Sequence, residues 1–102
     1  MTTTIYRIAL NGTNTELTEE QYNAYEEISN QLGTLTGFEK QIAWATDIRN
    51  SFLAQIIKLS RVVPEAQKPA MAALFSRPAK AKFWIDNRDE FVMTIGKKLR
   101  NF

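Results

Sequence analysis

The sequence "LTGFEKQIAWATDIRNSFL" (residues 35–53) predicts the helix around which the rest of the chain folds. Thr36 and Glu39 have the spacing of a capping box, a pattern that begins helices. The helix can continue to residue 63, because Pro64 disfavours helical geometry at the residue before it. Apolar residues recur at helical spacing on one side of it: Phe38, Ala45, Ile48, Phe52, Ile56, Leu59 and Val63. We therefore predict a central helix over residues 37–63.

The N-terminal segment predicts a β-hairpin followed by a helix. Residues 3–17 alternate as strands do on either side of Asn11-Gly12, a pair that supplies the positive φ angles of a tight hairpin turn. An isolated hairpin is marginal in water, so it must pack on the helices. Thr18 and Gln21 have the spacing of another capping box, which predicts a helix over residues 18–32.

The C-terminal part predicts two more helices, over residues 68–76 and 79–100. A break at residues 86–88 is an open alternative, because Asn87 and Glu90 could cap a new helix there. The expected fold is a single α+β domain over residues 1–102. In it, an N-terminal β-hairpin packs on a mainly α-helical body of three to four helices.

The residue types that are missing limit the chemistry. The chain has neither Cys nor His, so the usual zinc sites, thiol chemistry and imidazole catalysis are excluded. It also lacks a glycine-rich phosphate loop and a calcium-loop pattern. We expect a protein that is not an enzyme and binds no cofactor and no metal. The sequence contains no membrane-spanning run and no signal-peptide pattern, which favours a location inside the cell.

The charge is unevenly distributed along the chain. Residues 1–57 carry three basic and seven acidic side chains, whereas residues 58–102 carry ten basic and four acidic ones. Such asymmetry favours a charged partner, although it is also compatible with two solvated ends that happen to differ. The candidate protein-binding residues form an acidic helix face: Glu19, Glu20, Glu26 and Glu27. The candidate nucleic-acid-binding residues are Arg61, Lys68, Arg77, Lys80, Lys82, Lys97, Lys98 and Arg100.

Arg49 falls on the predicted apolar face of the central helix, and Arg88 falls on that of the last helix if this helix is continuous. Burying a guanidinium is costly unless a carboxylate or several carbonyls meet it. The candidate carboxylates are Glu39, Asp47, Asp86 and Asp89. Both arginines can tie helices together or line a groove for an anion, and we favour the structural role. Trp44 and Trp84 could each pack in the core or form a platform on which a ligand stacks, and their helical spacing favours the core.

The combination of "NG…ELTEEQYNAYEE", "LTGFEKQIAWATDIRNSFL" and "AKFWIDNRD" resembles a small domain of phages and mobile elements of Gram-positive bacteria. That domain typically reads LTGSEKQIAWA followed by IR, with a WID stretch and an arginine near the end. The matching positions are Gly37, Glu39, Lys40, Gln41, Trp44, Ile48, Arg49, Trp84, Ile85, Asp86 and Arg88. Phe38 and Thr46 depart from the pattern. The resemblance implies a genetic origin and no established chemistry.

Small stand-alone proteins from such elements often inhibit host defence, anti-CRISPR proteins among them. The resemblance and the charge asymmetry together lead to the expectation of an inhibitor that binds a host defence nuclease in the host cytoplasm. The acidic face could act there as a nucleic-acid mimic. The alternative is a nucleic-acid-binding accessory module that uses the basic C-terminal half. A third possibility is a structural interaction domain without a defence role.

Overall fold

A computed structural model of the chain describes residues 4–102 and shows an α+β fold. The chain begins with a β-hairpin and continues as helices, which confirms the predicted fold class. The elements are β1 (Ile5–Leu10), β2 (Thr13–Thr18), α1 (Glu19–Asn30), α2 (Glu39–Ser60), the 3-10 helix η1 (Glu65–Gln67), α3 (Lys68–Ser76), α4 (Ala81–Asp86) and α5 (Val92–Arg100).

The hairpin forms where the sequence predicted it, apart from Thr3, which lies outside the described residues. Strands β1 and β2 are antiparallel, with Ile5 opposite Thr18 and Leu10 opposite Thr13. Asn11 and Gly12 both have positive φ angles, 52° and 72°, as a type I′ turn requires.

Helix α1 begins at the predicted capping box. The Gln21 backbone N–H donates to Thr18 Oγ1 at 3.2 Å, and the Thr18 N–H donates to Gln21 Oε1 at 3.0 Å. The helix buries Ala24, Tyr25 and Ile28 and ends at Asn30, two residues earlier than predicted.

The predicted capping box of α2 is wrong. The N-cap of this helix is Phe38, whose side chain makes no capping bond. Thr36 lies two residues too early to cap, and its backbone forms a parallel β-bridge with Lys80. At the other end the helix stops at Ser60, because Arg61 turns the chain with a φ of 63° before Pro64 is reached.

Helix α2 is the centre of the core, as predicted. Ala45, Ile48 and Phe52 are buried, and so are Leu53 and Ile57 beside them. Phe38 and Leu59 were expected in the same stripe but are 79% and 58% exposed. They lie near the two ends of the helix, where the neighbouring elements no longer cover its surface.

The predicted helix over residues 79–100 is two helices, so the continuous form is wrong and the open alternative holds. Asn87 ends α4, because its side-chain Nδ2 donates to the Phe83 carbonyl oxygen at 2.7 Å. Helix α5 then begins after Phe91, not at a cap formed by Asn87. Phe91, the N-cap of α5, is 83% exposed.

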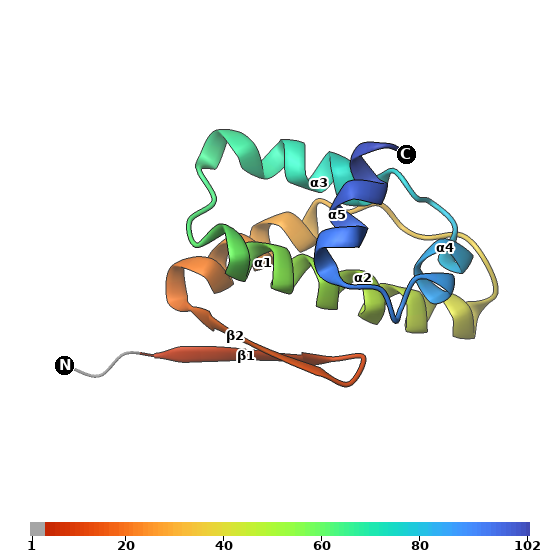
Figure 1. Cartoon of the computed structure of the whole chain (residues 1–102), viewed down its shortest axis with the longest axis horizontal. Helices are drawn as coiled ribbons and strands as arrows, with labels where there is room; N and C mark the ends of the chain where they lie inside the picture. Colours follow the sequence, from red (N-terminus) through yellow and green to blue (C-terminus); the bar gives the residue numbers. More distant parts are fainter. Residues whose placement is uncertain (1–3) are drawn as a thin grey trace.

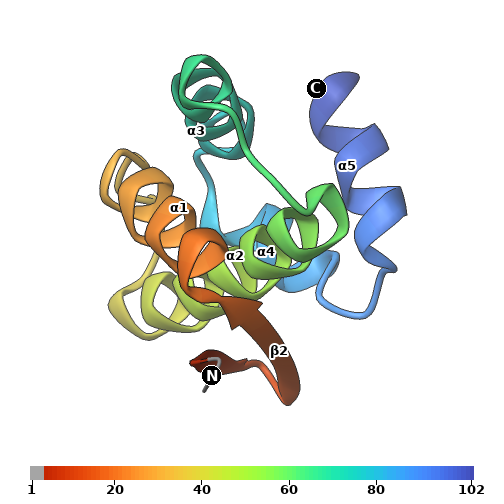
Figure 2. The ribbon, with the colours of Figure 1, turned by 90° about the vertical axis from the view of Figure 1, so that its left-hand side faces the viewer.

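The elements are stacked around α2. The hairpin lies along one side of α2, and α3 and α5 lie on the opposite side, as Figure 1 shows. Figure 2 shows α3 and α5 standing apart above α2, with α1 beside it. None of the helices within residues 4–102 has the length and apolar character needed to cross a membrane.

Candidate functional site

The acidic face is fully on the surface of α1. Glu19, Glu20, Glu26 and Glu27 are all exposed, and α1 contains no Lys or Arg. Glu19 and Glu26 are seven residues apart and form one row, while Glu20 and Glu27 form the adjacent row. Glu19 and Glu20 occupy the first turn, where the helix dipole stabilises negative charge.

One member of the acidic face is already bound within the protein. Lys68, at the start of α3, forms ion pairs with Glu27 and with Glu65, the second at 2.6 Å. The lysine is 8% exposed, and its hydrogen bonds to Glu27 and then Glu65 raise its pKa. Glu27 and Lys68 therefore link α1 to α3, and Lys68 is not an exposed nucleic-acid contact. Among residues 4–102, Glu19, Glu20 and Glu26 form no salt bridge.

Arg61 lies near Lys68 and away from the other six candidate basic residues. Gln21 of α1 donates through Nε2 to the Arg61 carbonyl oxygen at 3.1 Å. Arg61 shares a cavity of about 400 Å³ with Glu20, Glu27 and Lys68. The fold thus places Arg61 and Lys68 beside the acidic face, so the eight predicted basic residues do not form one surface.

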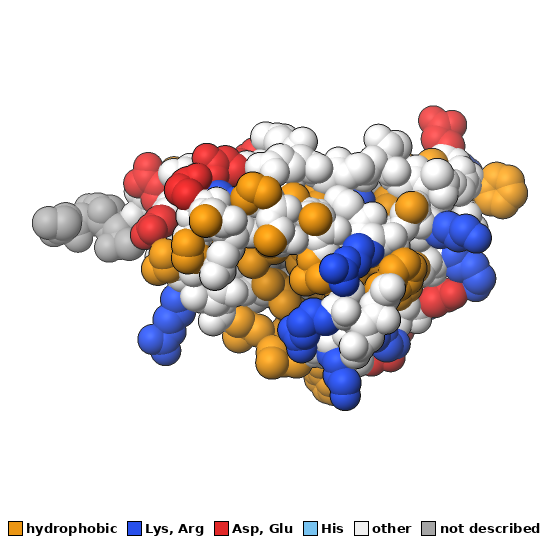
Figure 3. All heavy atoms as spheres, turned by 90° about the horizontal axis from the view of Figure 1, so that it is seen from above, with side chains coloured by type: hydrophobic (Ala, Val, Ile, Leu, Met, Phe, Trp, Pro, Cys, Tyr) orange, Lys and Arg blue, Asp and Glu red, His pale blue; other side chains and the backbone are white. Residues whose placement is uncertain are grey.

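The other six basic residues lie on α3, α4, α5 and the segment between α3 and α4; we call them the basic face: Arg77, Lys80, Lys82, Lys97, Lys98 and Arg100. In Figure 3, Lys and Arg side chains gather with hydrophobic ones between them, while several Asp and Glu side chains gather near the N-terminal end. The linear charge asymmetry is therefore partly a spatial one, with Arg61 and Lys68 as exceptions beside the acidic face.

Only part of the basic face is free to bind a partner. Lys82 pairs with Asp86 at 2.7 Å, and Lys98 pairs with Glu90 at 3.5 Å. Within the described chain, Lys80, Lys97 and Arg100 are exposed and form no salt bridge.

Arg77 holds α3 against the end of α5. Its Nη1 donates to the Leu99 carbonyl oxygen at 3.0 Å and to that of Arg100 at 3.4 Å. A cation close to the last carbonyls of a helix is favourable for the helix dipole.

Two phenylalanines accompany the basic face. A cavity of about 500 Å³ is lined by Arg77, Lys80, Lys82, Phe83 and Phe102, among others. The rings of Phe83 and Phe102 meet edge to face with centroids 5.4 Å apart, and Phe102 is 62% exposed. Nothing in the sequence indicated this cavity.

Among the residues that match the pattern of the phage and mobile-element domain, some lie on the surface and others lie in the core. Arg88 lies over the Trp44 ring, with its Cζ 5.1 Å from the ring centroid, and Trp44 is 44% exposed. Arg88 is exposed, which corrects the prediction that it is buried on an apolar face; the break after α4 carries it to the surface. Glu39 is exposed in the first turn of α2. Asp86 forms its salt bridge with Lys82 and is not the carboxylate partner of Arg49 or Arg88.

Trp84 and Arg49 are structural. Trp84 is fully buried, stacks on Phe75 with centroids 6.0 Å apart, and donates through Nε1 to the Pro78 carbonyl oxygen at 3.3 Å. Arg49 is 5% exposed and donates through Nη1 to the Gly33 carbonyl oxygen at 2.9 Å.

No carboxylate within residues 4–102 pairs with Arg49, contrary to the carboxylate expected from its sequence. Its Nε finds no acceptor there either. Burial lowers the pKa of the guanidinium, because the charged form is poorly solvated.

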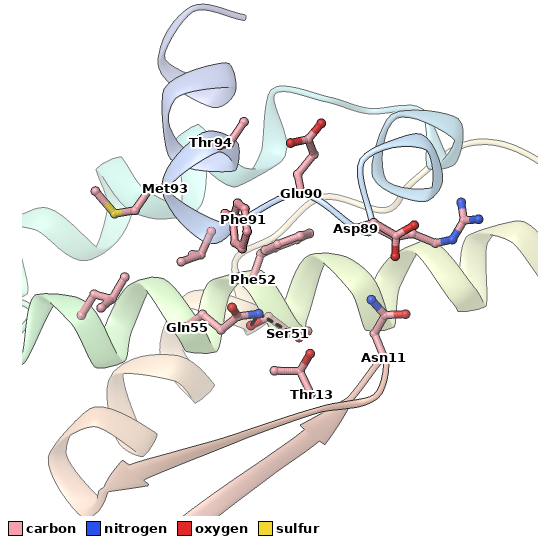
Figure 4. A pocket seen from close by; sticks show the side chains of 13 residues that line it. Asn11, Thr13, Ser51, Phe52, Gln55, Asp89, Glu90, Phe91, Met93 and Thr94 are labelled. Carbon is pink, nitrogen blue, oxygen red and sulfur yellow. Dashed lines mark hydrogen bonds between the residues drawn. The ribbon is translucent and has the colours of Figure 1, made fainter.

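A cavity of about 690 Å³ lies between the hairpin turn and the start of α5. In Figure 4, Asn11 and Thr13 lie on one side of it, Ser51, Phe52 and Gln55 of α2 lie along its floor, and Phe91 and Met93 lie on the other side. Asp89 and Glu90 are its acidic side chains. Within residues 4–102, no three acidic side chains gather closely enough to hold a metal ion.

Comparison of the chain with protein-family models, with curated proteins and with solved structures found no significant match. The resemblance to phage and mobile-element domains therefore stays a prediction.

Proposed function

We propose that this chain is a small non-enzymatic binding protein of phage or mobile-element origin that inhibits a host nuclease-based defence in the host cytoplasm. The acidic face of α1 contacts a basic channel of the nuclease in place of nucleic acid. The observation that carries the proposal is that Glu19, Glu20 and Glu26 are exposed and without a salt bridge in the described chain, on a helix that lacks basic residues. Complementary charge of this kind accelerates association and selects the partner.

The test is charge reversal at these three glutamates, leaving Glu27 in place because it binds Lys68. The purified triple variant, with each of the three changed to Lys, is compared with wild type in a CRISPR nuclease cleavage assay. The matched control carries the same change in net charge elsewhere, at the exposed residues Glu39, Asp47 and Asp89.

Loss of inhibition in the first variant but not in the control supports the proposal. Inhibition that survives in both variants contradicts it. Circular dichroism of each variant shows whether the helices remain intact, which matters because lysine in the first turn of α1 opposes the helix dipole.

A second function, nucleic-acid binding by the basic face, is favoured by the cavity that contains Phe83 and Phe102. Unpaired bases stack on aromatic rings while basic side chains follow the phosphates. Binding of single-stranded oligonucleotides should then weaken steeply between low and moderate salt. Changing Lys80, Lys97 and Arg100 to Gln should reduce both the affinity and its salt dependence, whereas unchanged binding would contradict this function.

A further inference from the structure

The groove between α3 and α5 combines an apolar floor with two arginines. Its volume is about 440 Å³, and it is lined mainly by Ile56, Met71, Leu74, Gly96, Arg77 and Arg100. None of its lining residues is acidic. Figure 3 shows hydrophobic side chains beside a group of Lys and Arg on this side of the molecule.

Gly96 keeps the groove open. A Cβ added at this position would lie 3.6 Å from Ile56 Cδ1 and 3.7 Å from Arg100 Nη1. These are ordinary contact distances, so a Cβ at residue 96 fits without forcing its neighbours apart, and any further side-chain atoms would take up space beside Ile56 and Arg100. The same distances show that the Arg100 guanidinium folds back over Gly96 at the side of the groove.

The positive charge in the groove lies where α3 approaches the C-terminal end of α5. Arg77 bonds to the carbonyl oxygens of Leu99 and Arg100 and is thereby fixed in position. The Arg100 side chain is exposed and, within residues 4–102, has no acidic partner. An occupant of the groove therefore needs an apolar surface and a negatively charged group close to it.

We propose that this groove binds an acidic amphipathic helix of a partner protein. Such a helix lays apolar side chains spaced three and four residues apart into a groove of this kind, and its flanking Glu residues reach the arginines. The groove fits a nucleic acid less well. Its one aromatic residue, Phe75, is 1% exposed and stacked on Trp84, which leaves no ring face for a base. The surface is distinct from the acidic face of α1.

The probe is a synthetic helix of about 18 residues, long enough to be partly helical alone, with Leu at i, i+3, i+4 and i+7 and Glu beside them. A second peptide has Lys in place of every Glu, and a single-stranded oligonucleotide is the third ligand. Affinity is measured by fluorescence anisotropy, and the contact surface by amide chemical shifts of the labelled protein. We expect the acidic peptide to shift the amides of Gly96 and Leu74 and to bind at least about tenfold tighter than the basic one.

Two variants test the geometry. Gly96→Leu should fill the groove and abolish binding while preserving the fold, because leucine is a better helix former than glycine. Gly96→Ala is the matched control and should still bind. Arg100→Glu should reverse the preference between the two peptides.

Equal affinity for both peptides, full binding by Gly96→Leu, or shifts confined to another surface would each overturn the proposal. So would an oligonucleotide that shifts the groove amides when the acidic peptide does not. The assay contains no nuclease, so its outcome is independent of the acidic face and of the proposed inhibition.

Discussion

Arg49 offers a direct test of whether a buried arginine contributes through its charge or through its hydrocarbon stem. The guanidinium makes one hydrogen bond, to the Gly33 carbonyl oxygen, and has no carboxylate partner in the described chain. Arg49→Met retains most of the stem and removes the charge. Arg49→Ala removes both. Comparing the two variants separates the contributions.

The expected free energies differ clearly. In Arg49→Met, loss of one hydrogen bond, about 1–2 kcal/mol, is offset by the removal of a poorly solvated charge. Gly33 is exposed, so its carbonyl can bond to water instead. We expect this variant to lie within about 1 kcal/mol of wild type. Arg49→Ala also removes the two methylene groups Cγ and Cδ, worth roughly 0.8 kcal/mol each, and leaves a cavity, so we expect a loss of about 2–4 kcal/mol.

Urea denaturation gives these free energies directly, and thermal melting checks them. A loss of 1 kcal/mol lowers the Tm of a domain of this size by roughly 4–8 °C, so Arg49→Ala should melt roughly 8–32 °C below wild type. If Arg49→Met is as unstable as Arg49→Ala, the charge itself stabilises the fold, and the reasoning from burial is wrong.

Gly12→Ala should lower the free energy of unfolding in urea by about 1–2 kcal/mol, because Gly12 has a φ of 72°. Gly33→Ala is the control, because the backbone there needs no positive φ and the space is open, and it should not lower that free energy. Arg88→Ala should cost about 0.5–1 kcal/mol and change the fluorescence of the half-exposed Trp44; an unchanged emission spectrum would contradict the stacking. Glu27 and Glu65 raise the pKa of Lys68 above 10.5. The ion pairs of Lys68 therefore stabilise the fold below that pH, and this stabilisation is lost as the pH rises through the pKa that Lys68 has in the folded protein. Urea midpoints at about pH 9 and about pH 11 should therefore differ more in wild type than in Lys68→Met.

The sequence predicted the features that depend on neighbouring residues. The Asn11-Gly12 turn and the Thr18 capping box form as expected, because each is a short-range pattern with one favourable geometry. Thr36 had the same local pattern and did not cap, because pairing with the segment that precedes α4 took its backbone hydrogen bonds. Local rules fail where a distant segment offers a competing partner.

The candidate surfaces were only partly predictable. The acidic face follows from the spacing of glutamates on one helix, and all four residues are exposed. The sequence does not show which of these glutamates is unpaired, because Lys68 pairs with Glu27 from 41 residues away in the chain. The cavity with Phe83 and Phe102 depends in the same way on how the C-terminus packs after α5.

The sequence by itself determined the α+β class, the hairpin, the central helix and the charge asymmetry, because these depend on periodicity, turn residues and composition. The tertiary structure decided which charged side chains are paired and which arginine is buried. It also decided that the last helix breaks, so that Arg88 reaches Trp44 and α5 leaves a groove beside α3. The ion pairs, the buried arginine and the groove depend on contacts between residues far apart in the chain, which no local pattern specifies. The break after α4 has a local cause in Asn87, and the sequence left it as one of two alternatives.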